Sequence, residues 1–280
     1  MPSLHNAISS LLLLFIMASC QAPHVVPLPQ AYAHNDYVHR RPLFDALDCG
    51  FCSIEADIFL VDGKLLVAHE RDEVRADRTL ESLYLAPLQR IVHENGGRVY
   101  RDGPTITLMI DFKSPAEVLY PPLRAELEKY AEMLTTWHGD RVEERAITIV
   151  LTGDRPRPAE IAGEAVRYVA LDGKLPDLDG DVPASLMPRV GIEWRKVLTW
   201  NGKDSMPESQ RAILRDLAER SHAKGRQLRL WGGPDDANVW QQLLSNGVDL
   251  INTDDLPGLR DFLLRRQRYS QNSSKLPSGS

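Results

Sequence analysis

The segment that most constrains the fold is the run of residues 105–113, which is almost continuously apolar until its end. A strand of this composition is covered on both faces, as in a parallel sheet, because a face turned to water would carry alternate polar residues. Its charged residues, Asp111 and Lys113, come only at its end. Pro115 then suits the first turn of a helix in which leucine recurs at helical spacing. The segment predicts a buried strand followed by a helix.

The same alternation recurs along the chain. Strands are predicted at 30–33, 53–60, 105–113, 146–151, 168–172, 190–194, 227–231 and 249–254. Helices are predicted at 42–48, 79–93, 115–134, 207–223, 234–244 and 257–268. About eight strands alternating with helices favour a single (β/α)8 TIM barrel over a doubly wound sheet. We therefore predict one α/β barrel domain at residues 30–268, with a small hairpin inserted after its second strand.

The two ends of the chain have a different composition. An apolar run from Leu11 followed by small residues up to Cys20 is typical of a secretory signal peptide, and it is too short for an ordinary membrane span. Residues 1–20 also resemble a lipoprotein signal in which Cys20 becomes lipidated, so we expect an exported protein, periplasmic or anchored to a membrane by this lipid. The alternative is a simple apolar tail. Residues 21–29 are predicted as a linker and 269–280 as a disordered tail.

Overall composition narrows the class of function. Hydrophobic residues make up 43% of the 280 and charged residues 26%, which is ordinary for a globular protein. The formal net charge of −6 argues against a nucleic-acid binder, and we expect a monomer. Cys49 and Cys52 lack the second pair that a zinc site needs, so we predict two buried small hydrophobic residues. A disulfide between them stays open in an exported protein.

A predicted hairpin gathers acidic residues and a histidine. Glu55 and Asp57 share one face of their strand because side chains alternate. Asp62 and Gly63 form a turn signal, and the apolar run after them returns the chain toward the acids and ends at His69. Taken alone, this stretch also fits a surface hairpin with solvated acids. Whether the hairpin is part of a functional site or a solvated surface element depends on the residues at the ends of the other strands.

Polar side chains follow several other predicted strands. The active sites of (β/α)8 barrels lie where the strands end. The strand-end candidates are His34, Asn35, Glu55, Asp57, His69, Asp111, Lys113, Trp231 and Asn252, and Asp36 and Asp254 also follow the first and the last of these strands. An apolar strand tolerates charges at its tip only where water, a metal or a charged ligand compensates them. This census favours a functional site over a solvated hairpin.

The residue types at these positions indicate phosphate chemistry. Three carboxylates suit a hard divalent cation, Mg²⁺ or Ca²⁺, with Glu55, Asp57 and Asp111 as its ligands. Two histidines, His34 and His69, suit general acid and base catalysis, and Lys113 suits a substrate phosphate. The candidates left for the substrate pocket are Asn35, Trp231 and Asn252. Structural alternatives remain for some of them: His34 as a helix cap, Lys113 in a buried ion pair with Asp111, and Trp231 in the core.

The order of these motifs resembles the phospholipase-C-like phosphodiesterase superfamily, which includes glycerophosphodiester phosphodiesterases and phosphatidylinositol-specific phospholipases C. The resemblance covers residues 30 to about 262. Its last motif is Gly247–Asp249, which leads to Asn252. It implies a divalent metal at Glu55, Asp57 and Asp111 and catalytic roles for His34 and His69. Glycerophosphodiesterases usually have Arg where this chain has Asn35, and Glu where it has Asp111. The His-Asn-Asp-Tyr opening resembles a little-characterised subgroup.

These observations predict a phosphoric diester hydrolase that acts on a glycerophosphodiester or a phospholipid head group. One alternative is metal-independent cleavage of the phosphatidylinositol phospholipase C type. Another is a non-catalytic surface lipoprotein that binds a phosphorylated ligand. A glycosidase that used Glu55 and Glu193 would leave both histidines and Lys113 without a role.

Overall fold

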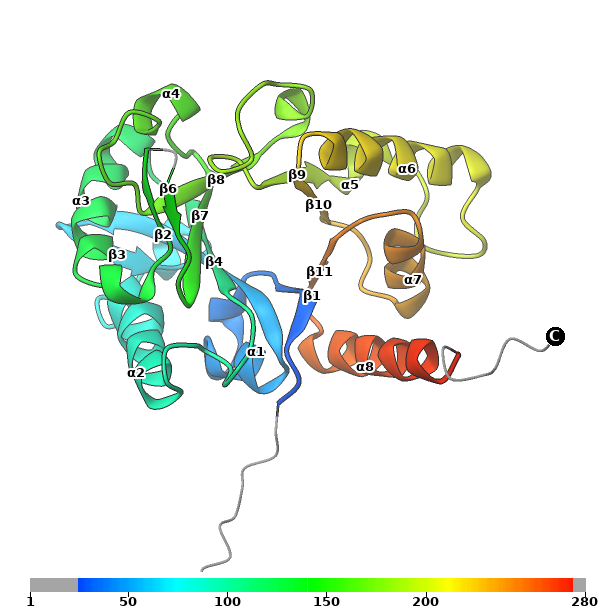
Figure 1. Ribbon diagram of the computed structural model, residues 1–280, viewed down its shortest axis with the longest axis horizontal. Coiled ribbons are helices and arrows are strands. Elements are labelled where there is room, and N and C mark those ends of the chain that lie inside the picture. Colours follow the sequence, from blue (N-terminus) through cyan, green and yellow to red (C-terminus); the bar gives the residue numbers. More distant parts are fainter. Residues whose placement is uncertain (1–24, 140, 274–280) are drawn as a thin grey trace, which may run out of the picture.

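A closed parallel barrel forms the centre of the molecule. The structure, a computed structural model, describes residues 25–139 and 141–273. Eight strands run parallel around the barrel in the order β1-β2-β4-β7-β8-β9-β10-β11, and β11 pairs with β1 to close the ring (Figure 1). Their bounds are Leu28–Ala33 (β1), Phe51–Val61 (β2), Ile106–Phe112 (β4), Ile147–Gly153 (β7), Val169–Gly173 (β8), Arg189–Glu193 (β9), Gln227–Trp231 (β10) and Leu250–Thr253 (β11). The predicted (β/α)8 barrel is confirmed.

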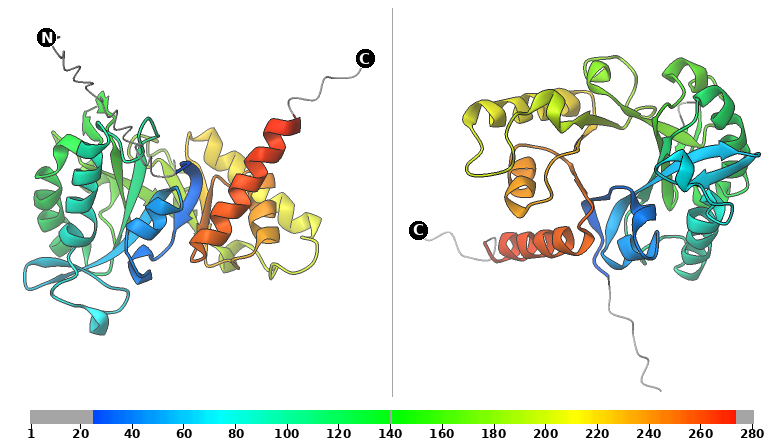
Figure 2. Two further views of the ribbon diagram at one scale, coloured as in Figure 1. Left: turned by 90° about the horizontal axis from the view of Figure 1, so that it is seen from below. Right: turned by 180° about the vertical axis from the view of Figure 1, so that it is seen from behind.

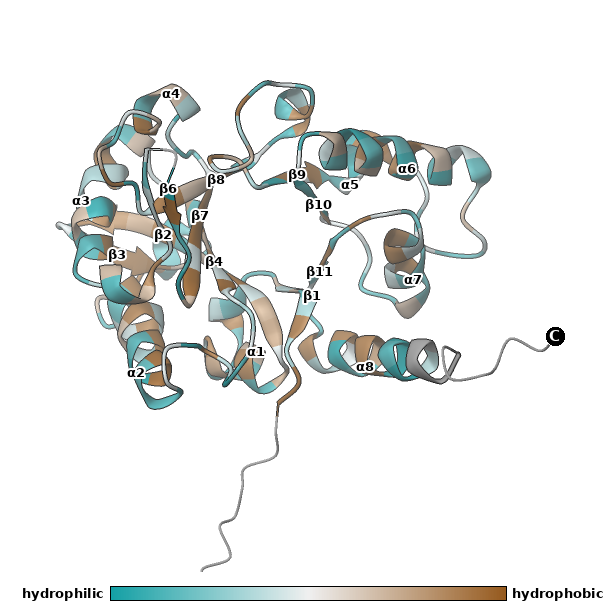
Figure 3. Ribbon diagram, in the orientation of Figure 1, coloured by the Kyte–Doolittle hydropathy of each residue, from teal (hydrophilic) through white to brown (hydrophobic). Residues whose placement is uncertain are grey.

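Helices surround the barrel and follow its strands (Figures 1 and 2). They are α1 (Phe44–Asp48), α2 (Ala86–Glu94), α3 (Ala116–Glu128), α4 (Pro158–Ile161), α5 (Trp194–Val197), α6 (Glu208–Ala223), α7 (Ala237–Ser245) and α8 (Leu256–Ser273). The long helices α6 and α8 carry both hydrophilic and hydrophobic segments (Figure 3), as expected for helices that pack on one side only. Within the described part of the chain, no helix combines the length and the apolarity that a membrane crossing requires.

The predicted hairpin is present after the second barrel strand. Strand β3 (Lys64–Val67) pairs antiparallel with the end of β2, and both extend outward from the barrel (Figure 2). Asp62 and Gly63 form the turn with positive φ angles of 48° and 75°. Such a two-residue turn requires left-handed backbone at both positions, which Asp tolerates and Gly favours. The hairpin therefore has a fixed register, with Ile58 opposite Val67.

Apolar side chains fill both the barrel and the layer between strands and helices. Inside the barrel, Tyr32, Met109, Val150 and Ala170 form one buried cluster. Trp137 joins it from a small hairpin that precedes β7, formed by β5 (Thr136–His138) and β6 (Arg141–Glu143). The larger cluster packs the outer strand faces against the helices. The interior of the barrel is thus a packed core. A site can open only at the mouth of the barrel, where the carboxyl ends of its strands lie.

The boundaries of several elements differ from the prediction. Strand β1 begins at Leu28, inside the predicted linker, and α8 continues past residue 268 to Ser273. Helix α3 ends at Glu128 instead of reaching residue 134. The predicted helix 79–93 begins with a π-helical turn, η3 (Glu81–Leu85), and the β5–β6 hairpin was not predicted. The apolar periodicity of residues 115–134 continues after the helix because the following turns also pack inward.

Two further expectations concern the cysteines and the chain ends. Cys49 and Cys52 are both buried free thiols, as predicted for small hydrophobic residues, and they form no disulfide. The predicted signal peptide, Cys20 and the tail from residue 274 lie outside the described residues. Export, lipidation and a monomeric state therefore stay predictions.

Candidate active site

The strand ends surround a cavity of about 740 Å³ at the mouth of the barrel. Seven of the nine predicted site residues line it: His34, Asn35, Glu55, His69, Asp111, Lys113 and Trp231. The other two lie directly behind the wall. Asp57 is fully buried beneath His69 and Lys113, and Asn252 accepts a hydrogen bond of 2.9 Å from Arg229, which lines the cavity. The predicted residues therefore converge on one site.

Three carboxylates form the centre of this site. One oxygen each of Glu55, Asp57 and Asp111 lies within 4.8 Å of the others. The barrel register causes this arrangement, because Asp57 pairs with Asp111 across β2 and β4 and Glu55 precedes Asp57 by two positions. Gly153 on β7 makes room, since a Cβ there would lie 2.3 Å from Oδ1 of Asp111. The register thus gathers three acidic groups, with the ammonium group of Lys113 in contact with two of them.

Two members of the triad, Asp111 and Glu55, have raised pKa values. Burial, and then the neighbouring Asp57, raise the pKa of Asp111 to about 7 against the opposing charge of Lys113. Burial also raises the pKa of Glu55, although Arg229 and His34 oppose the rise. A bound cation would favour the charged forms of both carboxyl groups.

Lys113 provides a positive charge beside the triad. Its Nζ lies 2.9 Å from Oδ2 of Asp57 and 3.5 Å from Oδ1 of Asp111. The structural alternative from the sequence, an ion pair with Asp111, is thus present, with Asp57 as the closer partner. Lys113 still lines the cavity, and two carboxylate contacts leave one of its three N–H donors for another acceptor.

His69 is held at the site by residues from two other segments. Its Nδ1 lies 3.1 Å from Oδ2 of Asp57 and 3.0 Å from the hydroxyl of Tyr37. The Tyr37 hydroxyl donates to Asp57 over 2.7 Å. A carboxylate can only accept, so the proton of neutral His69 belongs on Nδ1. This leaves Nε2 as the atom that can take up a proton.

His34 has a separate carboxylate partner. Its Nδ1 lies 2.8 Å from Oδ1 of Asp254, which follows the adjacent strand β11. Burial lowers the pKa of His34, but the hydrogen bond to Asp254 and the nearby charge of Glu55 outweigh it, so the pKa lies above its ordinary value. The imidazole thus holds a proton more readily than a free histidine. It lines the cavity and does not serve as a helix cap.

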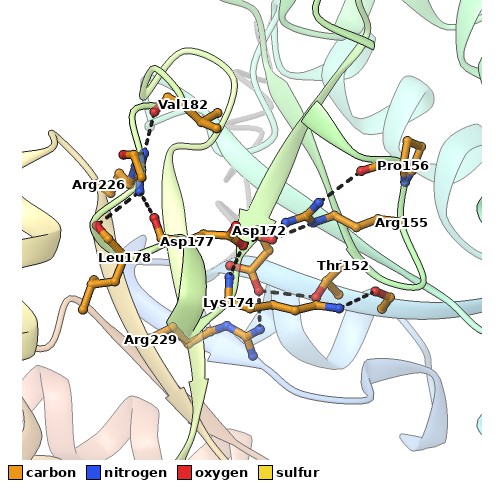
Figure 4. Close-up of polar contacts among 12 residues, drawn as sticks. Thr152, Arg155, Pro156, Asp172, Lys174, Asp177, Leu178, Val182, Arg226 and Arg229 are labelled. Atoms are coloured by element: carbon orange, nitrogen blue, oxygen red, sulfur yellow. Dashed lines mark hydrogen bonds and ion pairs between the residues drawn. The ribbon is translucent and has the colours of Figure 1, made fainter. Parts of the chain in front are cut away.

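Sequence reasoning missed an interior layer of polar residues that supports the site. Arg229 on β10 donates to Asp172 on β8 over 2.9 Å, a contact visible in Figure 4, and stacks 4.5 Å above the ring of Tyr32. The Tyr32 hydroxyl donates to Oε2 of Glu55 over 2.9 Å. Strand alternation could have revealed these residues, because Tyr32 precedes His34, and Arg229 precedes Trp231, by two positions.

Other members of the opening motif and Trp231 have distinct positions. Asn35 adopts a left-handed backbone, with φ of 46°, and lines the cavity. Asp36 is fully buried away from the cavity and accepts hydrogen bonds from the backbone N–H of Leu43 and the hydroxyl of Tyr84. Trp231 is 37% exposed at the cavity rim, so its interpretation as a core residue is wrong.

The fold and the site define a phosphodiesterase-type barrel, and comparison with known proteins agrees. Residues 21–172 match the AIM6-like phosphodiesterase domain. A glycerophosphodiester phosphodiesterase of Parabacteroides distasonis has a similar fold, with a TM-score of 0.50 at 14% sequence identity over 85% of this chain and 98% of that one. The chain belongs to the AIM6-like phosphodiesterase domain family, within the superfamily that the sequence motifs resemble.

Curated relatives of the chain come from fungi. The protein named altered inheritance of mitochondria protein 6 from Lachancea thermotolerans is 31% identical over 278 residues, and the one from Eremothecium gossypii is 29% identical over 274. The matches cover 82% and 84% of this chain. They span 64% of the Lachancea protein and 69% of the Eremothecium protein, so both relatives contain additional sequence.

Proposed function

We propose that this protein is a metal-dependent phosphodiesterase that cleaves a P–O bond in a glycerophosphodiester or a phospholipid head group. One arrangement carries the proposal: a carboxylate triad lies between two histidines, and each histidine is held through Nδ1 by a carboxylate. Membership in a phosphodiesterase domain family supports it. The reaction consumes water or another hydroxyl and releases an alcohol.

The triad fits a hard divalent cation, Mg²⁺ or Ca²⁺. Oδ1 of Asp57 is buried and has no hydrogen-bond partner among the described residues. An unpaired buried carboxylate oxygen is costly unless a cation or a donor satisfies it. Glu55, Asp57 and Asp111 would hold the ion through the oxygen atoms that such cations prefer. When bound, the ion would withdraw charge from a phosphoryl oxygen and stabilise the transition state.

The two histidines would divide the proton transfers between them. Nε2 of His69 is available as a base, because Nδ1 carries the proton toward Asp57 and Tyr37. It would remove the proton of the attacking hydroxyl. His34, whose pKa is raised by Asp254, would hold a proton on Nε2 and donate it to the leaving oxygen.

Lys113 would contact the substrate phosphate. Two of its donors face Asp57 and Asp111, and the third is available to a phosphoryl oxygen in the cavity. A positive charge at this position also opposes the negative charge that builds on the phosphoryl group. Lys113 therefore links the acidic triad to the ligand.

Turnover of bis(p-nitrophenyl) phosphate tests the proposal. We expect p-nitrophenol release with added Mg²⁺ or Ca²⁺, loss of activity in EDTA and recovery when the cation is restored. Activity that EDTA does not change would indicate the metal-independent mechanism. Absence of turnover under all conditions, together with binding of a phosphodiester, would indicate a non-catalytic binding protein.

A further inference from the structure

The cavity extends well beyond the carboxylate triad to the opposite side of the barrel. Around a ring of eight strands, β8 lies four positions from β1, and β9 lies four positions from β2. The segments that follow β8 and β9 therefore face His34 and Glu55 across the mouth. Together with the last two residues of β9, Ile192 and Glu193, they contribute Lys174, Leu175, Pro176 and Lys196 to the cavity wall. We call these six residues the distal wall.

Lys174 is the residue of the distal wall that is best placed to bind an anion. Its Nζ donates to the backbone oxygen of Gly153 over 3.2 Å, and its backbone N–H donates to Asp177 over 2.8 Å (Figure 4). Among the residues that the structure describes, Lys174 is the one cavity-lining lysine or arginine that makes no ion pair with a carboxylate. Two N–H donors of its ammonium group remain for a ligand.

The other charges near the distal wall largely compensate one another. Nζ of Lys196 lies 3.2 Å from Glu193, and both side chains are partly exposed. Arg229 is paired with Asp172, and Gly191 lacks the side chain that would collide with this pair. The positive charge of Lys174 is therefore not compensated by a carboxylate, so the distal side of the cavity attracts anions.

A phosphodiester that binds at the triad has two alcohol groups, and the cavity gives one of them room to extend toward the distal wall. The volume of about 740 Å³ greatly exceeds that of a phosphate group and is ordinary for a pocket that holds a whole small molecule. Leu175, Pro176 and Ile192 offer apolar contact to the carbon atoms of this alcohol. Lys174 would then meet its far end.

We propose that the distal wall selects phosphodiesters whose second alcohol carries an anionic group, a carboxylate or a further phosphate. This inference rests on the proposed function and names its substrate class. Lys174 binds the anion with its two remaining donors, and Lys196, whose charge Glu193 largely compensates, contributes less. A quaternary ammonium group at the same place is disfavoured, because its positive charge is repelled by that of Lys174.

Paired substrates test the inference. Glycerophosphoglycerate and glycerophosphoglycerol differ by a carboxylate in place of a CH₂OH group, and glycerophosphocholine supplies the cation. In the protein as it exists, we expect kcat/KM for the glycerate ester to exceed that for the glycerol ester about tenfold, as expected when one charged hydrogen bond is gained. The choline ester should be the poorest of the three.

Variants of the distal wall then assign the effect. Lys174→Gln should reduce the glycerate-to-glycerol ratio of kcat/KM to near one, and Lys196→Gln should reduce it less. Lys224→Gln is the matched control, because Lys224 pairs with Asp181 outside the cavity. It should keep the ratio of the unchanged protein.

The outcomes separate this inference from the function on which it rests. Turnover of bis(p-nitrophenyl) phosphate together with a ratio near one in the unchanged protein would overturn the anionic subsite and leave the phosphodiesterase intact. A ratio that survives Lys174→Gln would also overturn it. Absence of turnover of every diester would overturn both.

Discussion

Nδ1 of His34 lies 2.8 Å from Oδ1 of Asp254, although 220 positions separate the two residues in the chain. The closure of the barrel produces this contact, because β1 and β11 are neighbours and both residues follow the ends of their strands. The contact fixes the ring of His34 and raises its pKa, and it makes the role of this histidine testable.

Replacement of Asp254 by Asn should shift the pH profile of turnover. Asp254 raises the pKa of His34, so its removal lowers that pKa. If His34 donates a proton, activity falls as pH rises through this pKa, and the alkaline limb of the kcat/KM profile should move to lower pH. The profile of bis(p-nitrophenyl) phosphate hydrolysis between pH 5 and 9, a range of about four units around the histidine value, measures this.

The chain offers a matched control for this experiment. His222 and Asp249 form a similar pair at 2.8 Å outside the cavity. Asp249→Asn should leave both limbs in place. Movement of the acidic limb in Asp254→Asn would contradict the assignment of His34 as the acid and indicate that it acts as the base.

The fold could be predicted in outline, because most barrel strands are largely apolar and each long helix has amphipathic periodicity, whereas the short helices α4 and α5 were not predicted. The β5–β6 hairpin was missed, since three-residue strands contain too little periodic signal. Long-range supports were also missed. The contacts from Arg229 to Asp172 and from Tyr37 to Asp57 join segments that are far apart in the sequence. The pattern of one segment does not predict which other segments will lie beside it in the fold.

Replacement of Lys113 by Met should strengthen metal binding and weaken turnover. The ammonium group lies 2.9 Å from Asp57 and competes with any cation for the triad. Without it, we expect the Kd for Mg²⁺ to fall about tenfold, the equivalent of about 1.4 kcal/mol. Turnover should fall at least as much, because the phosphate contact is lost.

Calorimetric titration with Mg²⁺ measures the affinity, and bis(p-nitrophenyl) phosphate measures turnover. Lys64→Met, an exposed position at the start of β3, serves as the control and should change neither value. Weaker Mg²⁺ binding by Lys113→Met would show that Lys113 supports the metal site and does not compete with the cation.

Lengthening the turn of the β2–β3 hairpin should separate catalysis from metal binding. Two glycines inserted between Asp62 and Gly63 would disturb the register that places His69 beside Asp57, while Glu55 and Asp57 stay within the barrel strand. We expect kcat to fall about 10²-fold, since a small misplacement of a catalytic group can cost this much. The Kd for Mg²⁺ should change by less than about threefold, well under 1.4 kcal/mol.

The same two glycines inserted between Gly96 and Gly97, where a side chain would meet open space, are the control. That insertion should preserve turnover. Equal losses of turnover and Mg²⁺ affinity in the hairpin variant would rule out a purely positional role of the turn.

Replacement of Asp36 by Asn should stabilise the protein at neutral pH. Burial raises the pKa of Asp36 from 3.8 to about 6, despite hydrogen bonds from Leu43 and Tyr84. Between these values the folded protein holds a proton that the unfolded chain has lost, so this group favours folding as pH falls from about 6 to 4. At pH above about 6, the buried carboxylate costs up to about 3 kcal/mol.

Urea denaturation at about pH 7.5 and pH 4 tests this expectation. The advantage of Asp36→Asn should be largest at the higher pH and should shrink by about 2–3 kcal/mol at the lower one. Asp102→Asn, at an exposed position with a left-handed backbone, should show no such pH-dependent difference. An advantage that stays constant with pH would mean that ionisation of Asp36 is not its cause.

The diametric arrangement of the strands has an evolutionary consequence. The match to the domain family ends at residue 172, so it includes the triad and both histidines but stops before Lys174. Under the proposed function, the first half of the chain would supply the groups that break the bond, while Lys174 and the support of His34 by Asp254 would come from the second half. If the proposals hold, exchange of the segments that follow β8 and β9 would change the preferred ligand while the carboxylate triad and both histidines stay in place.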